Sequence, residues 1–240
     1  MLLTSPKGRI LVRLAGGLGL LLGVSLAGLA LYGFVTFPDV ATLVTANPRS
    51  TAFIEARRAE AKGQGHPFNL RWSWAPLTRI SPHLQRAVIV AEDASFYQHE
   101  GFDWAGVQEA MSRNWERGEL HRGGSTITQQ LAKNLYLSPD KNLVRKAQEA
   151  LITRALERRL RKKRILEVYL NVVEWGDGVF GAEAAARRHF GKSAADLTPE
   201  EAALLAAMLP DPQRYDPLRV TPYLAKRQQQ ILRWMHRNNH

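Results

Sequence analysis

The chain has 240 residues, carries a formal net charge of +11 and contains no cysteine. This length is sufficient for one or two domains with a substantial core. The absence of cysteine excludes a disulfide framework and a thiolate metal site, and the positive charge favours an anionic partner such as nucleic acid, phospholipid headgroups or a phosphorylated substrate.

An uncharged apolar run occupies residues 14–37. A helix of this length crosses a hydrocarbon core of about 30 Å, and Lys7, Arg9 and Arg13 favour a cytoplasmic N-terminus. A cleaved signal peptide is the alternative, but the run exceeds the usual apolar length and no clear small-x-small site ends it. We therefore expect a basic cytoplasmic segment at 1–13, a transmembrane helix over the apolar run and an extracytoplasmic remainder.

The remainder is predicted to be mostly α-helical. A connector is expected at 38–69, and the stretch GQGHPFNLRWSWAP across its end is expected to be a loop or a short strand. Beyond it, capping residues followed by periodic apolar positions predict successive helices within a soluble domain at 70–240. The predicted helices begin at Ser81, Asp103, Thr126, Thr198 and Thr221, with one long basic helix or a helix pair from Asn142 to Asn171.

Two adjacent carboxylates, Glu92 and Asp93, end the first of these helices. Glu92 follows Leu84 and Val88 at intervals of four residues, which places it on an apolar helix face. Desolvation there would raise the pKa of the carboxyl group and make it a better general base near neutrality. The alternative is that these carboxylates pair with an arginine or close the helix end.

The segment HRGGSTITQQLAKNL, residues 121–135, places two glycines before a helix rich in hydroxyl and amide side chains. Backbone N–H groups at a helix N-terminus attract anions, particularly phosphates. Thr128, Gln129 and Gln130 supply further donors, and Lys133 follows about one turn later. An ordinary capped helix is the alternative.

A third segment, RKAQE, places Arg145 and Glu149 four residues apart on one helix face, with Lys146 beside them. Alone it predicts a simple intrahelical ion pair. Together with the other two segments it offers cations for a pyrophosphate and a second carboxylate. The basic stretch at 158–164, RRLRKKR, suggests lipid phosphates rather than nucleic acid for an extracytoplasmic domain, with a solvated helix face as the alternative.

Four segments, EDASFYQHEG, GGSTITQQ, RKAQE and KKRILEVYLN, occur in the order and spacing of the peptidoglycan glycosyltransferase family 51. Over residues 70–235 the chain is similar to its monofunctional biosynthetic transglycosylase branch. The resemblance implies a lysozyme-like α-helical fold with a smaller, membrane-associated jaw lobe. It implies a glycosyltransferase that polymerises lipid II into linear glycan strands with release of undecaprenyl pyrophosphate. The chain leaves no room for a transpeptidase domain, so no transpeptidase activity is expected.

The resemblance also implies roles for individual residues. Glu92 is expected to deprotonate the 4-hydroxyl of the acceptor GlcNAc, which attacks the anomeric carbon of the donor MurNAc with inversion. Glu149 is expected to orient nearby cations or to help hold a divalent metal, Mg²⁺ or Mn²⁺. The expected substrate-binding residues are Asp93, His99, Ser125, Thr126, Gln129, Gln130, Lys133, Lys141, Arg145 and Lys146.

Two positions depart from the family pattern: relatives often carry arginine at Lys141 and tyrosine at His189. The expected partners are lipid II, the growing lipid-linked glycan, the inner membrane and other cell-wall synthesis proteins, with no nucleic acid. A lytic transglycosylase or lysozyme-like hydrolase remains an alternative, but it needs neither a membrane anchor nor a row of cations. A non-catalytic membrane scaffold would need neither Glu92 nor Glu149.

Overall fold

The computed structural model describes residues 17, 19–20, 23–25, 28, 37–106, 108, 124–140 and 142–237. The chain divides into one unit that ends at Asp39 and a second that begins at Val40. The predicted transmembrane segment falls largely outside the described residues, as does most of the helix predicted after Asp103. None of the helices that can be described is long and apolar enough to cross a membrane.

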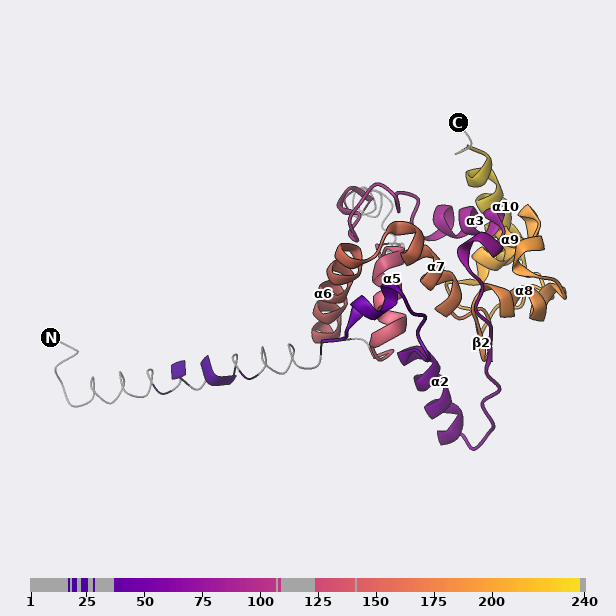
Figure 1. Ribbon diagram of the computed structural model, residues 1–240. Coiled ribbons are helices and arrows are strands. Elements are labelled where there is room, and N and C mark those ends of the chain that lie inside the picture. Colours follow the sequence, from indigo (N-terminus) through magenta and orange to yellow (C-terminus); the bar gives the residue numbers. More distant parts are fainter. Residues whose placement is uncertain are drawn as a thin grey trace, which may run out of the picture. The chain divides into compact units, whose positions relative to one another are not determined.

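The second unit is mostly α-helical, which confirms the predicted fold class at this level (Figure 1). Two short strands among its described residues, β1 and β2, pair in parallel, with Arg71 opposite Val179. The elements in chain order are η1 (Val40–Val44), α2 (Ala52–Gly63), β1 (Arg71–Trp72), η2 (Leu77–Arg79), α3 (Pro82–Glu92), α5 (Ile127–Tyr136), α6 (Leu143–Arg159), α7 (Lys162–Val172), β2 (Val179–Phe180), α8 (Ala182–Phe190), η3 (Ala194–Asp196), α9 (Pro199–Met208) and α10 (Pro222–Arg237).

Side-chain caps fix the helix starts that the sequence predicts. The hydroxyl of Ser81 accepts the backbone N–H two residues later, and proline follows it in the first turn of α3. Thr126 with Gln129 and Thr198 with Glu201 form reciprocal capping boxes at α5 and α9. These local hydrogen bonds confirm the predicted starts of all three helices.

The long basic segment after Asn142 is a helix pair. The Asn142 side chain accepts a hydrogen bond from the backbone N–H of Arg145 at 2.7 Å and starts α6. The chain leaves helical geometry at Leu160, where the backbone is extended, and α7 begins two residues later. Of the two predicted possibilities, one helix or a pair, the structure therefore has the pair.

Helix α2 lies in the region predicted as a connector, where no helix was expected. Thr51 caps it by accepting the N–H of Ile54 at 3.1 Å, and it buries Ile54 and Ala61 seven residues apart. It packs against α5, while η1 packs against α6. Because only two positions of α2 are buried, its apolar periodicity is weak, and the pattern does not reveal it.

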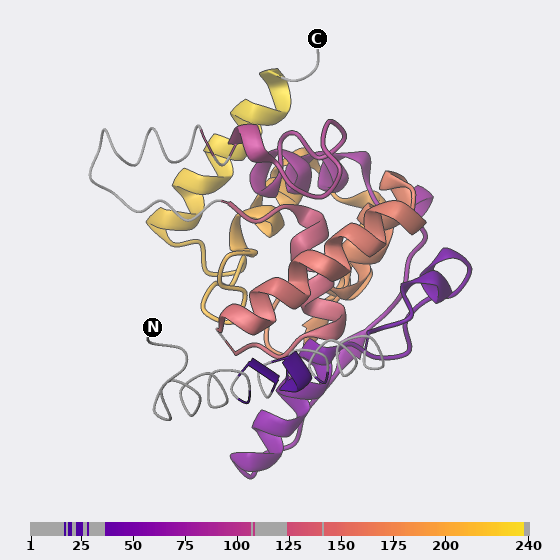
Figure 2. The same ribbon diagram turned by 90° about the vertical axis from the view of Figure 1, so that its left-hand side faces the viewer.

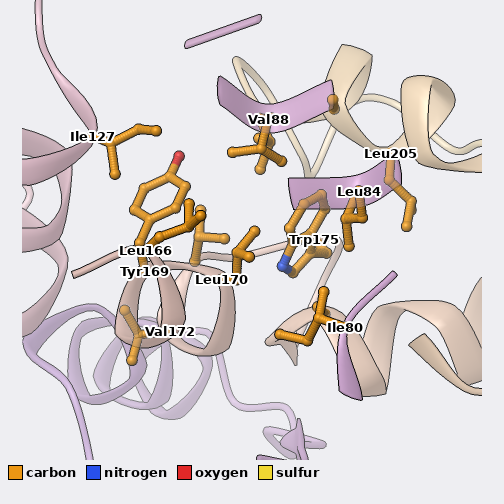
Figure 3. Packing of buried hydrophobic residues seen from close by; sticks show 14 of the residues in the cluster. Ile80, Leu84, Val88, Ile127, Leu166, Tyr169, Leu170, Val172, Trp175 and Leu205 are labelled. Carbon is orange, nitrogen blue, oxygen red and sulfur yellow. The ribbon is translucent and has the colours of Figure 1, made fainter. Parts of the chain in front are cut away.

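One part of the core lies where α9 packs against α3 and α10, an arrangement that both ribbon views show (Figure 2), and the same cluster of buried residues continues onto α5, α6 and α7. Every residue of α9 from Ala202 to Met208 is buried, as expected for a helix that is apolar on all sides. Trp175, fully buried, lies beside Ile80 and Leu84 in this core (Figure 3). The end of α3, and hence Glu92, is thereby held by a rigid apolar scaffold.

Candidate active site

Glu92 is the last residue of α3 and follows the fully buried Leu84 and Val88 on one face of the helix. Desolvation raises the pKa of its carboxyl group above the usual range for glutamate. The hydrogen bond from Gln130 and the positive charges of Arg227 and Lys133 oppose this shift without cancelling it. Glu92 is therefore a carboxylate with an elevated pKa, as a general base near neutral pH requires.

A hydrogen-bond chain orients the Glu92 carboxylate. The buried hydroxyl of Tyr169 donates to Oε1 of Gln130 at 2.9 Å, and Nε2 of Gln130 donates to Oε2 of Glu92 at 2.9 Å. Burial holds the pKa of Tyr169 well above its usual range, so the hydroxyl keeps its proton and donates. In the described part of the chain, Oε1 of Glu92 has no hydrogen-bond partner, so this oxygen can still accept a proton.

The carboxylate of Asp93, in contrast, is buried and binds groups of the protein itself. Its side chain is 1% exposed and accepts hydrogen bonds from the backbone N–H of Ile127 at 3.0 Å and from Nε2 of His99 at 2.9 Å. Nδ1 of His99 accepts the N–H of Gly101 at 3.1 Å, so the proton of a neutral imidazole lies on Nε2. Through these contacts Asp93 and His99 position the start of α5 and the turn at Gly101, as expected for a residue that positions neighbouring groups, and the predicted contact of either residue with substrate stays a prediction.

Replacing Asp93 with alanine is expected to destabilise the fold strongly. The change leaves the first N–H of α5 and the His99 ring without their buried partner, which costs about 3 kcal/mol. For a domain of this size the melting midpoint should fall by about 6–12 °C. Thermal unfolding of the detergent-solubilised chain measures this, with the exposed Glu100→Ala as the matched control. Equal midpoints for the two variants would contradict the assignment.

The two glutamines predicted to bind substrate, Gln129 and Gln130, make different contacts. Gln129 is buried and forms the capping box, in which its Oε1 accepts the backbone N–H of Thr126 at 3.0 Å. The Thr126 hydroxyl donates to the carbonyl of Gly101 at 2.8 Å. Gln130 instead faces Glu92, and Ser125 is exposed just before the helix. We expect Thr126 and Gln129 to act by fixing the start of α5, and Ser125 to be the accessible hydroxyl.

Gly101 is required where this turn meets α6. Its φ of +92° lies in the left-handed region, and a Cβ atom there would lie 2.8 Å from the Thr153 side chain. The close approach lets the 93–101 turn pack on α6 and α5 together. Gly101 ends the EDASFYQHEG segment, and no local pattern there indicates this role.

The predicted cations gather on α5 and α6. Burial lowers the pKa of Lys133, and its charge interacts with Glu92 on one side and with Glu149, Arg145 and Lys146 on the other. Arg145 donates from Nη1 to Oε2 of the buried Glu149 at 2.8 Å, and the exposed Lys146 pairs with the other oxygen. Within residues 142–237 and the other described ranges, Nε of Arg145 is buried without a partner. Lys141 lies outside the described residues.

This arrangement places a desolvated carboxylate beside a row of cations that keep unused N–H donors. A family model for transglycosylases matches residues 63–236. The chain belongs to the transglycosylase family. It is 50% identical over 207 residues to a biosynthetic peptidoglycan transglycosylase of Nitrosospira multiformis, a match that covers 86% of this chain and 90% of that protein. A protein of the same name from Aromatoleum aromaticum is 54% identical over 200 residues, covering 83% and 87%.

In this transglycosylase a residue missed by sequence reasoning, Arg227, also reaches the site. From α10 it donates from Nη2 to the carbonyl of Ala91 at 3.1 Å, next to Glu92, and its charge favours the ionised form of Glu92. Its side chain lies over the ring of Trp234. Arg227 sits 136 positions after Ala91 in an ordinary basic helix, so no local pattern points to it.

The donor set of this transglycosylase does not fit a divalent cation at Glu149. Arg145 and Lys146 each donate to one of the two carboxylate oxygens, and their positive charges repel a metal cation. Among the residues described, no group of three or more histidine, aspartate or glutamate side chains is placed to hold a metal ion. The predicted alternative role of Glu149, orientation of the cations, agrees with these contacts.

Proposed function

We propose that this peptidoglycan glycosyltransferase polymerises lipid II with Glu92 as the general base. Family membership supports glycan-chain polymerisation as the activity. The observation that carries the proposal further is the desolvated Glu92, one oxygen of which is fixed by Gln130 and the other of which has no partner among the described residues. The charge of Glu92 also interacts with that of Lys133.

In the proposed reaction, Oε1 of Glu92 takes the proton of the 4-hydroxyl of the acceptor GlcNAc. The oxygen forms a bond to the anomeric carbon of the donor MurNAc as the bond from that carbon to the pyrophosphate oxygen breaks. Attack from the opposite face inverts the anomeric configuration. Undecaprenyl pyrophosphate leaves with the electron pair of the broken bond, and Glu92 then passes its proton to solvent.

The cations stabilise the charge that develops on the leaving pyrophosphate. The Lys133 side chain makes no hydrogen bond or ion pair with any residue that the structure describes, and Arg145 keeps a buried donor unused. Donors that are fixed before the reaction and shielded from water stabilise such charge strongly. Glu149 keeps Arg145 and Lys146 in place.

We further propose the lysozyme-like fold with a jaw lobe and the topology expected from sequence. Residues 1–13 would be cytoplasmic, 14–37 would span the inner membrane, 38–69 would connect, and 70–240 would form the periplasmic catalytic domain. The apolar run and the basic residues before it support this orientation. A C-terminal reporter that is active only outside the cytoplasm tests it, and an inactive reporter on a membrane-bound, full-length chain would contradict it.

The exposed face of α6 supports contact with a lipid surface. Leu143 is 89% exposed at the start of the helix, and Leu151 is 61% exposed two turns later. In the basic stretch beyond them, two side chains are bound within the protein: Lys162 pairs with Glu157, and Arg164 donates to the carbonyl of Leu43. The exposed basic residues in the C-terminal part of the helix and just after it are Arg154, Arg158, Arg159, Arg161 and Lys163. An apolar end followed by a basic end suits an anionic membrane.

A chain that begins at residue 38 is expected to bind anionic vesicles more weakly when Arg158, Arg159 and Arg161 are neutralised. Each exposed basic residue near the surface contributes about 1 kcal/mol, so the loss should reach up to about 100-fold at low salt. Cosedimentation with phosphatidylglycerol vesicles measures it. The control neutralises three exposed residues of α10, Lys226, Arg233 and Arg237. Equal losses for both variants would mean that net charge alone binds the vesicles.

Incubation of the purified full-length chain with labelled lipid II tests the proposed function. A polymerase yields a ladder of glycan strands, whereas a lytic transglycosylase leaves lipid II intact and cleaves preformed glycan. A scaffold does neither. We expect the ladder, and cleavage of preformed glycan without any ladder would overturn the proposal in favour of the lytic alternative.

A further inference from the structure

Lys133 is held by an aromatic ring rather than by a carboxylate. Its Nζ lies 5.3 Å from the centroid of the Phe53 ring, within the range of a cation–π contact. Among the described residues, no hydrogen bond or ion pair joins the ammonium group of Lys133 to another side chain. The ring of Phe53 is therefore its direct contact. Both Lys133 and Phe53 are half-buried. The cation is thus fixed while its three N–H donors remain unused.

Phe53 comes from α2 and precedes the stretch that matches the family model at residues 63–236. Helix α2 packs on α5, the helix that carries Lys133. One turn after Phe53, Arg57 donates to the buried carboxylate of Glu174, from Nε at 3.2 Å and from Nη2 at 3.0 Å. Gln213 donates to the same carboxylate at 3.3 Å. This clamp fixes α2, and with it Phe53, against the segments that follow α7 and α9.

We propose that Phe53 is a positioning residue for glycosyl transfer, which holds the ammonium group of Lys133 and leaves its donors free for the pyrophosphate oxygens. A carboxylate partner would fix the cation by consuming one or more of those donors and part of its charge. A ring attracts the cation through its π face and accepts no conventional hydrogen bond. The inference rests on the proposed function, because it assumes that Lys133 meets the leaving pyrophosphate.

The contact also affects protonation. Burial lowers the pKa of Lys133, and Arg145 and Lys146 on α6 lower it further, whereas Glu149 on α6 and Glu92 on α3 act in the opposite direction. The ring of Phe53 favours the charged form. Loss of the ring should therefore lower the pKa of Lys133 still more, and the alkaline limb of the rate profile should move to lower pH.

Phe53→Leu tests the proposal because it keeps an apolar side chain of similar size and removes the π face. We expect kcat for detergent-solubilised lipid II to fall about 5- to 30-fold, the range that loss of a partly buried cation–π contact corresponds to. KM should change little, and Phe53→Trp should restore most of the rate. The matched control is Phe68→Leu, which removes the contact between Arg58 in the middle of the same helix and the ring of Phe68, a residue that follows the helix. That variant should keep the wild-type rate.

A second measurement separates positioning from general packing. In full-length protein labelled at lysine Cε, the Lys133 signal, assigned by its loss in Lys133→Arg, should carry a ring-current shift from Phe53. Phe53→Leu should abolish the shift and lower the titration midpoint, while Phe53→Trp should retain both. An unchanged kcat or an unchanged Lys133 signal in Phe53→Leu would overturn the inference. If wild type polymerises lipid II and Lys133→Ala does not, such a result leaves the proposed function intact; an inactive wild type would refute the function itself.

Discussion

Glu92→Gln is expected to abolish glycan polymerisation while the protein stays folded and still binds lipid II. Glutamine keeps the size of the side chain and can still meet the Gln130 amide, but its amide oxygen cannot accept the proton of an attacking hydroxyl. A general base contributes about 10²–10⁴-fold to the rate, so single-turnover consumption of lipid II should fall by that factor. Rapid-quench measurements on detergent-solubilised lipid II give this rate.

The same variant should be as stable as wild type or slightly more stable. Desolvation raises the pKa of Glu92, which means that the folded state holds its charge at a cost, and the neutral glutamine removes that cost. Thermal unfolding checks this, and the exposed Glu100→Gln serves as a matched control with unchanged rate and stability. A Glu92→Gln protein that is folded and polymerises at near the wild-type rate would exclude Glu92 as the base.

Lys133→Ala is expected to have the second-largest effect. Removal of one pre-positioned donor to a developing negative charge typically lowers kcat by about 10²–10³-fold. Lys133 is half-buried, and its charge interacts with active-site groups rather than with the exposed basic residues at the end of α6, so vesicle binding should be retained. Parallel measurements of turnover and vesicle cosedimentation test the two halves of this expectation.

The control for this prediction is Lys226→Ala, which removes an exposed lysine of α10 and the same unit of charge. It should leave turnover unchanged. Equal, small losses for both lysine variants would show that Lys133 acts only through net charge. Loss of vesicle binding in Lys133→Ala would place this residue at the membrane instead of in the active site.

The helix starts could be predicted from sequence because capping is local. Ser81, Thr126 and Thr198 each bond to a backbone group within three residues, so the signal lies within one turn. The placement of Glu92 on an apolar face was predictable for the same reason, since four-residue spacing fixes a helix face. The family resemblance then supplied expected roles that these patterns alone left open.

Contacts between distant segments could not be predicted in this way. Gln130 meets Tyr169 across 39 positions, and Arg57 meets Glu174 across 117. No periodicity within a helix encodes such pairings, because packing of the whole unit brings the partners together. For the same reason no local pattern indicates that the Asp93 carboxylate accepts the first N–H of α5, or that Phe53 lies against Lys133.

The pH dependence of kcat/KM for lipid II tests most directly whether a desolvated Glu92 acts as the base beside a cationic Lys133. Glu92 must be ionised, so the rate should rise with pH through a midpoint above the usual range for glutamate, because desolvation raises that pKa. Lys133 must be protonated, so the rate should fall again at a midpoint below the usual range for lysine, because burial lowers that pKa. Lys133→Arg should move only the midpoint of the alkaline limb, to higher pH. An acidic midpoint at or below the usual glutamate range, or no acidic limb at all, would contradict the account.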